Sequence, residues 1–197
     1  TTYNHPRWLE KTLWGFSMQS YRDFEIIVAD DGSGDETRAV IESLRSQIDI
    51  PIRHIWQEDD GFQKCKVMNK AIMASKSEYL IFTDGDCIPH PDFVSNHVEL
   101  AAENTMLSGG YFKLPLEVSR AISKQDILSG NATRPGWLLK QGVPFTPRIS
   151  KLFSHPLIVR ILDALTITRA TWNGHSSSTW KKHILATNGF DERMQYG

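Results

Sequence analysis

Two aspartates separated by one glycine, Asp84-Gly85-Asp86, end an apolar run from Tyr79 to Phe82. Side chains two positions apart on an extended segment point to the same side, so we expect both carboxylates on one face. Without a cation, two carboxylates about 5–6 Å apart would repel by roughly 1–3 kcal/mol. Such a pair suits a hard divalent ion, Mg²⁺ or Mn²⁺, which keeps open positions for phosphates and water. The triplet therefore predicts a metal site formed by Asp84 and Asp86.

A calcium-binding EF-hand loop is the main alternative for this triplet. Counting Asp84 as the first loop position places Pro89 at position six and Ser95 at position twelve. The EF-hand requires glycine and glutamate at those positions, so we exclude it. Gly85 removes the side chain between the two acids, and we expect it to leave room for a ligand to approach the backbone.

Acidic clusters also follow two earlier apolar runs. The run 24–29 ends at Asp30-Asp31, and the run 52–57 ends at residues 58–60. Short apolar runs bounded by turn signals predict buried strands. In open α/β sheets, ligands bind at the carboxyl ends of the strands. We therefore expect the three acidic clusters to face one crevice.

Helical patterns separate these strands. Residues 6–17 begin with a proline, which the first turn of a helix tolerates. Ser33, followed three residues later by Glu36, predicts a capping box for a helix that runs to about residue 46. Residues 62–74 and 92–101 are also expected to be helical. The alternation predicts an α/β fold with a mostly parallel sheet flanked by helices.

The composition is that of an ordinary soluble globular protein, with 197 residues, 40% hydrophobic and 23% charged. A net charge of -1 gives no indication of a nucleic-acid partner. The two cysteines form neither a disulfide framework nor a zinc-site spacing, which fits a reduced, cytoplasmic compartment. No signal peptide or membrane-spanning run is visible. The ends, TTYN and MQYG, read as interrupted elements, so we expect a fragment truncated at both ends.

The pattern changes after residue 110. Five prolines interrupt residues 111–171, and residues 149–165 form an amphipathic helical pattern. An ordinary packing helix, a lid, a partner surface and a membrane-surface helix all fit that pattern. These alternatives stay open.

Five segments, taken in order, resemble the family 2 glycosyltransferases of the GT-A fold, which transfer a sugar from a nucleotide-sugar donor. The resemblance implies a Rossmann-like domain, with residues 1–110 as the nucleotide-sugar-binding half and 111–197 as the acceptor-side portion. The tail also resembles the chondroitin-polymerase-like and β-1,4-galactosyltransferase-like branches. The segments are Thr2-Tyr3-Asn4, residues 25–33, Asp60-Gly61-Phe62 with Asn69-Lys70-Ala71, residues 79–87, and residues 172–197.

The resemblance implies roles in the first half. Asp31, with Asp30 beside it, would accept a hydrogen bond from the uracil ring N–H, which favours a uridine donor. Asp84 would contact the ribose or the metal, and Asp86 would hold the metal that bridges the two phosphates. Gln63 and Met68 stand where the family often has arginine, so Lys64 or Lys66 is expected near the diphosphate. The expected donor-binding residues are Thr2, Tyr3, Asn4, Asp30, Asp31, Ser33, Asp60, Lys66, Asp84 and Gly85.

The tail implies a pocket for the donor sugar and the acceptor. Asp191 and Glu192, with Asp86, are the expected catalytic residues, although Asp191 and Glu192 also fit a turn cap. The general base that deprotonates the acceptor hydroxyl is expected after Gly197. Structural roles for His175 and Trp172 stay open, and Ser176 replaces a common asparagine. The expected pocket residues are Trp172, Asn173, His175 and Ser176.

The function implied by the resemblance is metal-dependent, inverting transfer from a UDP-sugar to a hydroxyl of a glycan or lipid-linked glycan. Surface polysaccharide or lipopolysaccharide synthesis is the expected setting, in the cytoplasm or at the inner face of the membrane, with peripheral membrane contact. One alternative is an inactive nucleotide-sugar-binding module. Another is a sugar-1-phosphate nucleotidyltransferase, which should begin with a glycine-rich basic loop that residues 1–6 lack. The sequence sets neither the donor sugar nor the oligomeric state.

Overall fold

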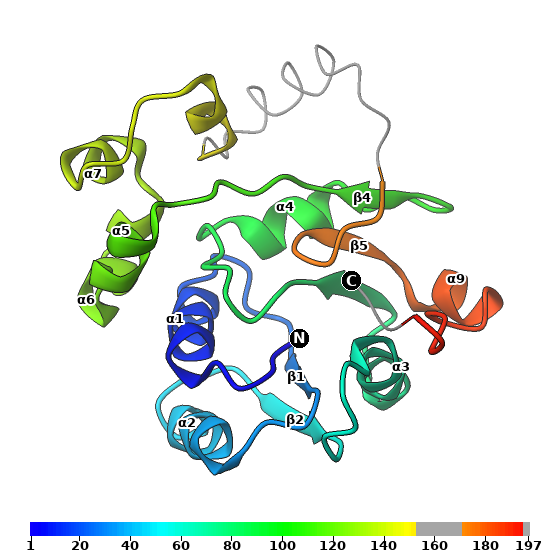
Figure 1. Ribbon diagram of the computed structural model, residues 1–197. Coiled ribbons are helices and arrows are strands. Elements are labelled where there is room, and N and C mark those ends of the chain that lie inside the picture. Colours follow the sequence, from blue (N-terminus) through cyan, green and yellow to red (C-terminus); the bar gives the residue numbers. More distant parts are fainter. Residues whose placement is uncertain (153–170, 195–197) are drawn as a thin grey trace.

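The computed structural model describes residues 1–152 and 171–194 of the chain (Figure 1). Helices and strands alternate through the first half, as the sequence predicts, and short helices dominate the second half. The elements are α1 (Pro6–Ser17), β1 (Ile26–Asp30), α2 (Asp35–Arg45), β2 (Ile52–Trp56), α3 (Lys64–Ala74), β3 (Tyr79–Phe82), α4 (Phe93–Glu99), β4 (Met106–Ser108), α5 (Leu116–Ala121), α6 (Lys124–Leu128), η1 (Asn131–Thr133), α7 (Pro135–Lys140), η2 (Pro147–Leu152), β5 (Ser177–Trp180) and α9 (Lys181–Ala186).

The strands form one parallel and two antiparallel pairs. β1 and β2 pair in parallel, with Ile26 opposite Ile52. β3 pairs antiparallel with β5, and β5 pairs antiparallel with β4. The predicted α/β class with a parallel sheet is confirmed. The antiparallel pairs were not predicted, because β5 has a polar sequence, Ser177 to Trp180, without the apolar run that marked the other strands.

Residues Thr1 and Thr2 join the two groups of strands. The backbone N–H of Thr2 donates to Ala29 O at 2.9 Å, beside the end of β1. On the other side, Thr1 O accepts from Gly85 N at 2.7 Å, just beyond the end of β3. The two residues therefore bring the carboxyl ends of β1 and β3 close together, where the sequence places two of its acidic clusters.

Most of the buried apolar side chains form one core against β1 and β2. Leu9 and Leu13 of α1 lie one turn apart and are both buried, as is Ile41 of α2. Burying each such side chain stabilises the fold by about 1.5–3 kcal/mol. Ile122 and Ile127, from the second half of the chain, enter the same core. The core therefore fixes β1 and β2 beneath the helices α1 and α2, which lie side by side in Figure 1.

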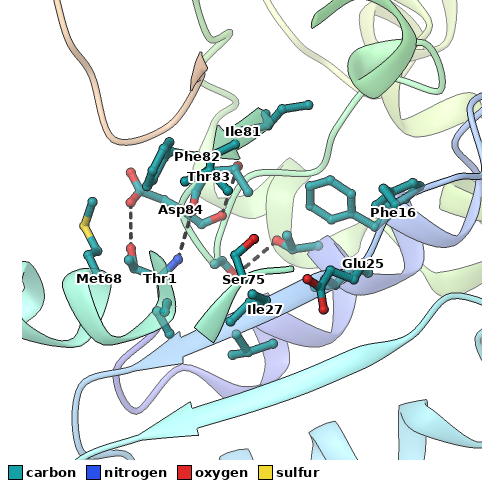
Figure 2. Close-up of a pocket in the computed structure, with 18 of the residues that line it drawn as sticks. Thr1, Phe16, Glu25, Ile27, Met68, Ser75, Ile81, Phe82, Thr83 and Asp84 are labelled. Atoms are coloured by element: carbon teal, nitrogen blue, oxygen red, sulfur yellow. Dashed lines mark hydrogen bonds between the residues drawn. The ribbon is translucent and has the colours of Figure 1, made fainter. Parts of the chain in front are cut away.

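A cavity of about 190 Å³ lies between β1 and β3 (Figure 2). It is lined by successive residues of both strands, 24–29 and 79–85, so the edges of the strands border it rather than their faces. Side chains of α1 and α3, such as Met68, close it above and below. Thr1 and Asp84 stand at its polar end. The cavity is therefore a gap within the sheet layer, with Thr1 and Asp84 at one end.

The predicted capping box at Ser33 and Glu36 is wrong. α2 begins at Asp35, and no side chain caps the helix at its N-cap residue, Gly34. Ser33 Oγ accepts from Asn4 N at 2.9 Å, and Asn4 Oδ1 accepts from Gly34 N at 3.0 Å. Asn4, in a left-handed conformation with φ 49°, thus takes the polar contacts that the capping box assigned to α2.

The predicted helix at 149–165 lies mostly outside the described residues. Its first four residues belong to the 3-10 helix η2. Within residues 1–152 and 171–194, no helix combines the length and the apolar character needed to cross a membrane.

Candidate active site

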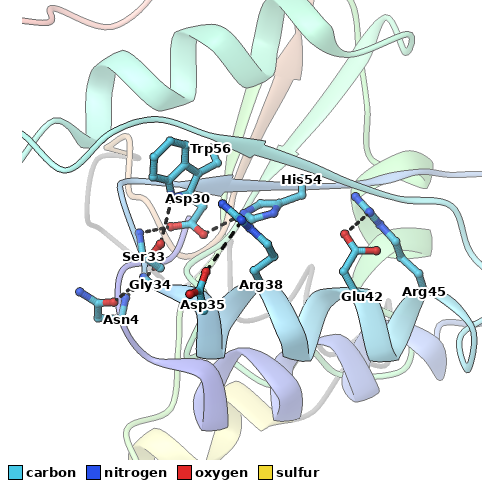
Figure 3. A network of polar contacts seen from close by, with 10 residues as sticks. All are labelled: Asn4, Asp30, Ser33, Gly34, Asp35, Arg38, Glu42, Arg45, His54 and Trp56. Atoms are coloured by element: carbon cyan, nitrogen blue, oxygen red, sulfur yellow. Dashed lines mark hydrogen bonds and ion pairs between the residues drawn. The ribbon is translucent and has the colours of Figure 1, made fainter.

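Asp30 holds the turn after β1 from the inside (Figure 3). Its side chain is 1% exposed; Oδ1 accepts from Ser33 N at 2.8 Å, and Oδ2 lies 2.8 Å from His54 Nε2 on β2. Burial would raise the pKa of Asp30, but the hydrogen bonds from His54 and Ser33 outweigh it and lower the pKa. Asp30 and Ser33, both expected to bind the donor, are therefore engaged in shaping the turn.

Asp31 lies beside the crevice with both carboxylate oxygens in hydrogen bonds. Oδ1 accepts from Gln57 Nε2 at 2.6 Å, and Oδ2 accepts from Gln63 N at 2.9 Å. Each carboxylate oxygen has a second lone pair, so Asp31 retains capacity for a ligand donor. Gln57 Oε1 is buried and has no hydrogen-bond partner among the described residues. Gln57, directly after β2, therefore supplies the amide that orients Asp31.

Tyr3, directly after Thr1 and Thr2, contacts the loop that follows β2. Its hydroxyl donates to Asp59 Oδ2 at 2.8 Å, and this hydrogen bond raises the pKa of Tyr3. Gly32, with φ 97°, allows the close approach, because a Cβ there would come within 2.6 Å of Asp59 Cα. Asp60, the residue expected at the site, is exposed, and its neighbour Asp59 makes the contact with Tyr3.

Asp84 forms an ion pair with Lys64, the first residue of α3. Lys64 Nζ donates to Asp84 Oδ1 at 2.9 Å, and Thr1 Oγ1 donates to the same oxygen at 3.0 Å. Burial would raise the pKa of Asp84, but the hydrogen bond and charge of Lys64 outweigh it and lower the pKa. Lys64 contacts Asp84, whereas Lys66 was the lysine named among the expected donor-binding residues.

The expectation that Asp84-Gly85-Asp86 continues an extended strand is wrong. β3 ends at Phe82, and Gly85 and Asp86 form a turn. A Cβ on Gly85 would lie 2.7 Å from Thr1 O. Gly85 therefore makes room for the chain's own backbone at this position, and the turn leaves Asp86 exposed at the crevice.

The donor set at this turn fits a divalent ion that arrives with phosphate. Among the described residues, no group of three or more His, Cys, Asp or Glu side chains is arranged to hold a metal. Asp84 and Asp86 both act electrostatically on His175. Mg²⁺ is commonly held by one or two carboxylates plus substrate phosphates and water. Two carboxylates therefore suffice when the phosphates come from the ligand.

The loop before β5 lies over the Lys64–Asp84 pair. A Cβ on Gly174 would lie 3.2 Å from Lys64 Nζ and 3.4 Å from Asp84 Oδ1. The next residue, His175, packs edge-on against Tyr111 with ring centroids 4.5 Å apart. Burial lowers the pKa of His175, against the opposing field of Asp84. The structure thus brings His175 and the acidic turn together.

Asn173 and Ser176 organise this loop. Asn173 Nδ2 donates to Ser108 Oγ at 2.7 Å and to Gly109 O at 3.0 Å, which ties the loop to β4. Asn173 Oδ1 accepts from Ser176 N at 2.7 Å. Ser176 is buried, and its carbonyl oxygen accepts from Gly109 N. Both residues, expected to contact the sugar or the acceptor, are engaged in holding the loop.

His97 is buried beneath β5. Its Nδ1 lies 2.7 Å from Ser178 Oγ, and its Nε2 lies 3.4 Å from Ser176 Oγ. Burial lowers the pKa of His97 to about 4, so the ring is neutral at pH 7. His97 and Val94 are the buried residues of α4, three positions apart on one helix face. That spacing in the sequence is the pattern that could have predicted the burial of His97.

Three aromatic rings join the end of β3 to the two C-terminal segments. Phe82 and Trp172 have ring centroids 5.1 Å apart, Trp172 and Phe190 5.4 Å, and Phe82 and Phe190 5.8 Å. Edge-on and tilted contacts at these distances are favourable for aromatic pairs. Trp172 therefore has the packing role that the sequence analysis left open.

Asp191 and Glu192 have different partners. Asp191 accepts from Arg193 Nε at 2.9 Å and from Arg193 Nη2 at 2.8 Å, and these bonds lower the pKa of Asp191 to about 2. Glu192 Oε1 accepts from Asn69 Nδ2 of α3 at 2.9 Å. Burial raises the pKa of the Cys65 thiol, and both carboxylates add to this effect. The turn that carries them therefore lies near the start of α3.

The structure places Asp31, Lys64, Asp84, His175 and Glu192 around the N-terminal half of α3. It also adds polar residues that were not among the predicted site residues. Apart from Asp59, which follows the predicted strand 52–57, each is a polar side chain within a predicted buried strand or on the inner face of a helix. These residues are His54, Gln57, Asp59, Asn69 and His97.

A protein family described as glycosyl transferase family 2 matches residues 1–147 of this chain. A chondroitin synthase of Escherichia coli is 35% identical over 111 residues, which cover 55% of this chain and 16% of that protein. A hyaluronan synthase of Pasteurella multocida is 31% identical over 109 residues, which cover 55% of this chain and 11% of that protein. The chain thus spans a small part of the length of these relatives.

A similar fold is found in a mannosyltransferase of Pyrobaculum calidifontis, solved in complex with GDP-Man and Mn²⁺. The TM-score is 0.64 and the sequence identity 19%, over 98% of this chain and 46% of the mannosyltransferase chain. At that identity, the similarity shows a shared fold, and the expected GT-A architecture is confirmed.

Proposed function

The chain belongs to glycosyl transferase family 2, and from this membership we propose that it transfers a sugar from a UDP-sugar donor to a glycan hydroxyl, with inversion at the anomeric carbon. The observation that carries the proposal is the pair formed by Lys64 and Asp84 at the carboxyl end of β3. Asp31 contacts Gln63, just before α3, and Glu192 contacts Asn69 within α3. A cation and several carboxylates thus surround the position where a diphosphate and an acceptor would meet.

The proposed donor pocket is formed by Asp31, Tyr3 and the end of β2. A uracil ring presents one N–H donor between two carbonyl acceptors, and Asp31 has free lone pairs to receive that donor. Tyr3 offers a half-exposed ring for stacking, held by Asp59. The structurally similar mannosyltransferase was solved with GDP-Man, so the choice between uracil and guanine is the first point to test.

Departure of the nucleoside diphosphate is the step that needs positive charge. Lys64 Nζ supplies one cation at the site. Asp84 and Asp86 would hold Mg²⁺ or Mn²⁺, and this ion, when bound, neutralises charge on the leaving diphosphate. The positive charges of Lys64 and the ion would stabilise the leaving diphosphate. The acceptor hydroxyl meanwhile attacks the anomeric carbon from the opposite side.

For the acceptor side, we propose that Glu192 and the loop from Trp172 to Ser176 shape the pocket. Asp191 is a weak base at neutral pH, because Arg193 keeps its pKa at about 2. The general base is proposed to follow Gly197. Similarity to synthases named for chondroitin and hyaluronan supports a glycan acceptor, and we propose a lipid-linked or surface glycan, assembled on the cytoplasmic side of the membrane.

Calorimetric titration of UDP and GDP, each with and without Mn²⁺, tests the donor proposal. We expect UDP to bind at least tenfold more tightly than GDP, and Mn²⁺ to strengthen UDP binding. Tighter binding of GDP, or no effect of Mn²⁺, would overturn the donor or the metal assignment. A screen of UDP-sugars with oligosaccharide acceptors then measures transfer. Binding without turnover in the full-length protein would favour the inactive module.

A further inference from the structure

Asn69, on the inner face of α3, makes three hydrogen bonds to the turn that carries Glu192. Its Nδ2 donates to Phe190 O at 2.9 Å and to Glu192 Oε1 at 2.9 Å, and its Oδ1 accepts from Phe190 N at 2.9 Å. One side chain thus satisfies both backbone groups of Phe190 and one carboxylate oxygen of Glu192. Asparagine is suited to this pattern, because its amide offers a donor group and an acceptor side by side.

The turn is shaped to receive this side chain. Asn188 and Gly189 both have positive φ, 61° and 77°, which bends the backbone toward α3. A Cβ on Gly189 would lie 2.5 Å from Asn69 Oδ1, so any larger residue would push the turn away. The glycine of the Gly-Phe-Asp-Glu segment is therefore required by its contact with Asn69.

The same helix carries the cation of the candidate active site. Lys64 begins α3 and pairs with Asp84, and Asn69 follows five residues later, about 7.5 Å along the helix axis. α3 therefore connects the Lys64–Asp84 pair and the Glu192 carboxylate through one rigid element. Packing of Phe190 against Phe82, at the end of β3, gives the turn a second support on the same side.

We propose that Asn69 is a positioning residue, which holds the turn at 189–192 and orients the Glu192 carboxylate toward the crevice at the start of α3. This inference rests on the proposed function, since it assigns to Asn69 the alignment of the acceptor-side turn with the donor site. Because the side chain contacts the turn and not the donor pocket, its loss should affect the transfer step and leave nucleotide binding intact.

The activity test compares Asn69→Ala with Lys70→Ala, a change at the next, exposed residue of α3. For Asn69→Ala we expect kcat for transfer to fall at least tenfold, with the dissociation constant for UDP within twofold of wild type. Lys70→Ala should match wild type in both. Unchanged kcat in Asn69→Ala, or loss of UDP affinity in proportion to kcat, would overturn the proposal, the latter because a general structural role would weaken both.

A double-mutant cycle asks whether Asn69 acts through Glu192. If it does, Glu192→Ala and the double variant Asn69→Ala/Glu192→Ala should have kcat values within about threefold of one another, since interacting residues give non-additive effects. Fully multiplicative losses would show that Asn69 acts by another route and would refute the assignment.

Limited trypsin digestion tests the same contact without any activity. Arg193 follows the turn, and its side chain is 90% exposed. We expect cleavage after Arg193 to be at least tenfold faster in Asn69→Ala than in wild type or Lys70→Ala. Equal rates would refute the holding role of Asn69. Failure of wild type to bind UDP would refute the proposed function instead, so the two failures are distinguishable.

Discussion

Replacing His54 by leucine should destabilise the protein strongly, because it removes the partner of a buried carboxylate. Asp30 is 1% exposed and His54 8% exposed at the side chain, with 2.8 Å between His54 Nε2 and Asp30 Oδ2. Breaking a buried ion pair by removing one partner costs about 3–5 kcal/mol, since the remaining charge is left without compensation. For a domain of this size, a loss of 1 kcal/mol lowers the melting temperature by about 2–4 °C. We therefore expect a decrease of about 6–20 °C.

The loss of stability in His54→Leu should depend on pH in a definite direction. The folded-state pKa of Asp30 lies below its ordinary value of 3.8, so the ionised carboxylate contributes stability above about pH 4 that is lost as the pH falls through the folded pKa. In His54→Leu, burial acts without the histidine, so the pKa of Asp30 rises. Protonated Asp30 carries no charge, so it loses less when His54 is removed. The difference in unfolding free energy between wild type and variant should therefore shrink on acidification.

Urea denaturation, followed by circular dichroism at several pH values, measures this difference. Lys182→Ala is the matched control, because it removes an exposed ion pair with Glu103, at 3.2 Å, which should contribute only about 0–1 kcal/mol. His54→Gln, which keeps a hydrogen-bond donor near Asp30, should lose less than the leucine variant. A leucine variant as stable as the control at pH 7, or a difference that grows toward low pH, would refute the reasoning.

Three further variants test the turn after β3 and the buried contact between α4 and β5. Asp86→Ala should reduce transfer at least a hundredfold with an unchanged melting temperature, and EDTA should do the same to wild type; near wild-type turnover would remove Asp86 from the proposed metal site. Gly85→Ala should destabilise the fold by about 1–3 kcal/mol, because its Cβ would meet Thr1 O at 2.7 Å; a thermal scan that matches wild type would contradict this. His97→Leu leaves Ser178 without its histidine partner and should cost about 1–3 kcal/mol by denaturant titration, whereas a fully stable variant would argue against a structural bond.

The strand and helix order could be predicted because it depends on local pattern. Apolar runs such as that in β1 and the helical spacing in α3 identify buried elements without knowledge of their neighbours. The position of acidic residues after those strands then predicted the crevice by a rule of sheet geometry. β5 was not predicted as a strand, because its serines and threonine are buried only through partners distant in sequence.

The direction of each side chain could not be predicted in the same way. Asp30 and Asp31 are adjacent in sequence, yet Asp30 binds His54 inside the sheet and Asp31 binds Gln57 beside the crevice. Likewise, Ser33 has the sequence of a capping residue, but Asn4 takes those contacts. In each case the outcome depends on a partner from another element, which local propensity does not contain.

The position of Asp31 and Asp84 on separate groups of strands has a consequence for how a ligand would affect the fold. Within residues 1–152 and 171–194, backbone hydrogen bonds link the β1–β2 pair to the β3–β5–β4 group through Thr1 and Thr2. Amide exchange reports how firmly each segment of a fold is held. Asp31 belongs to one group and Asp84 to the other. A ligand that contacts both carboxylates would tie the two groups of strands together, so its binding would slow amide exchange in β1 and β3 together.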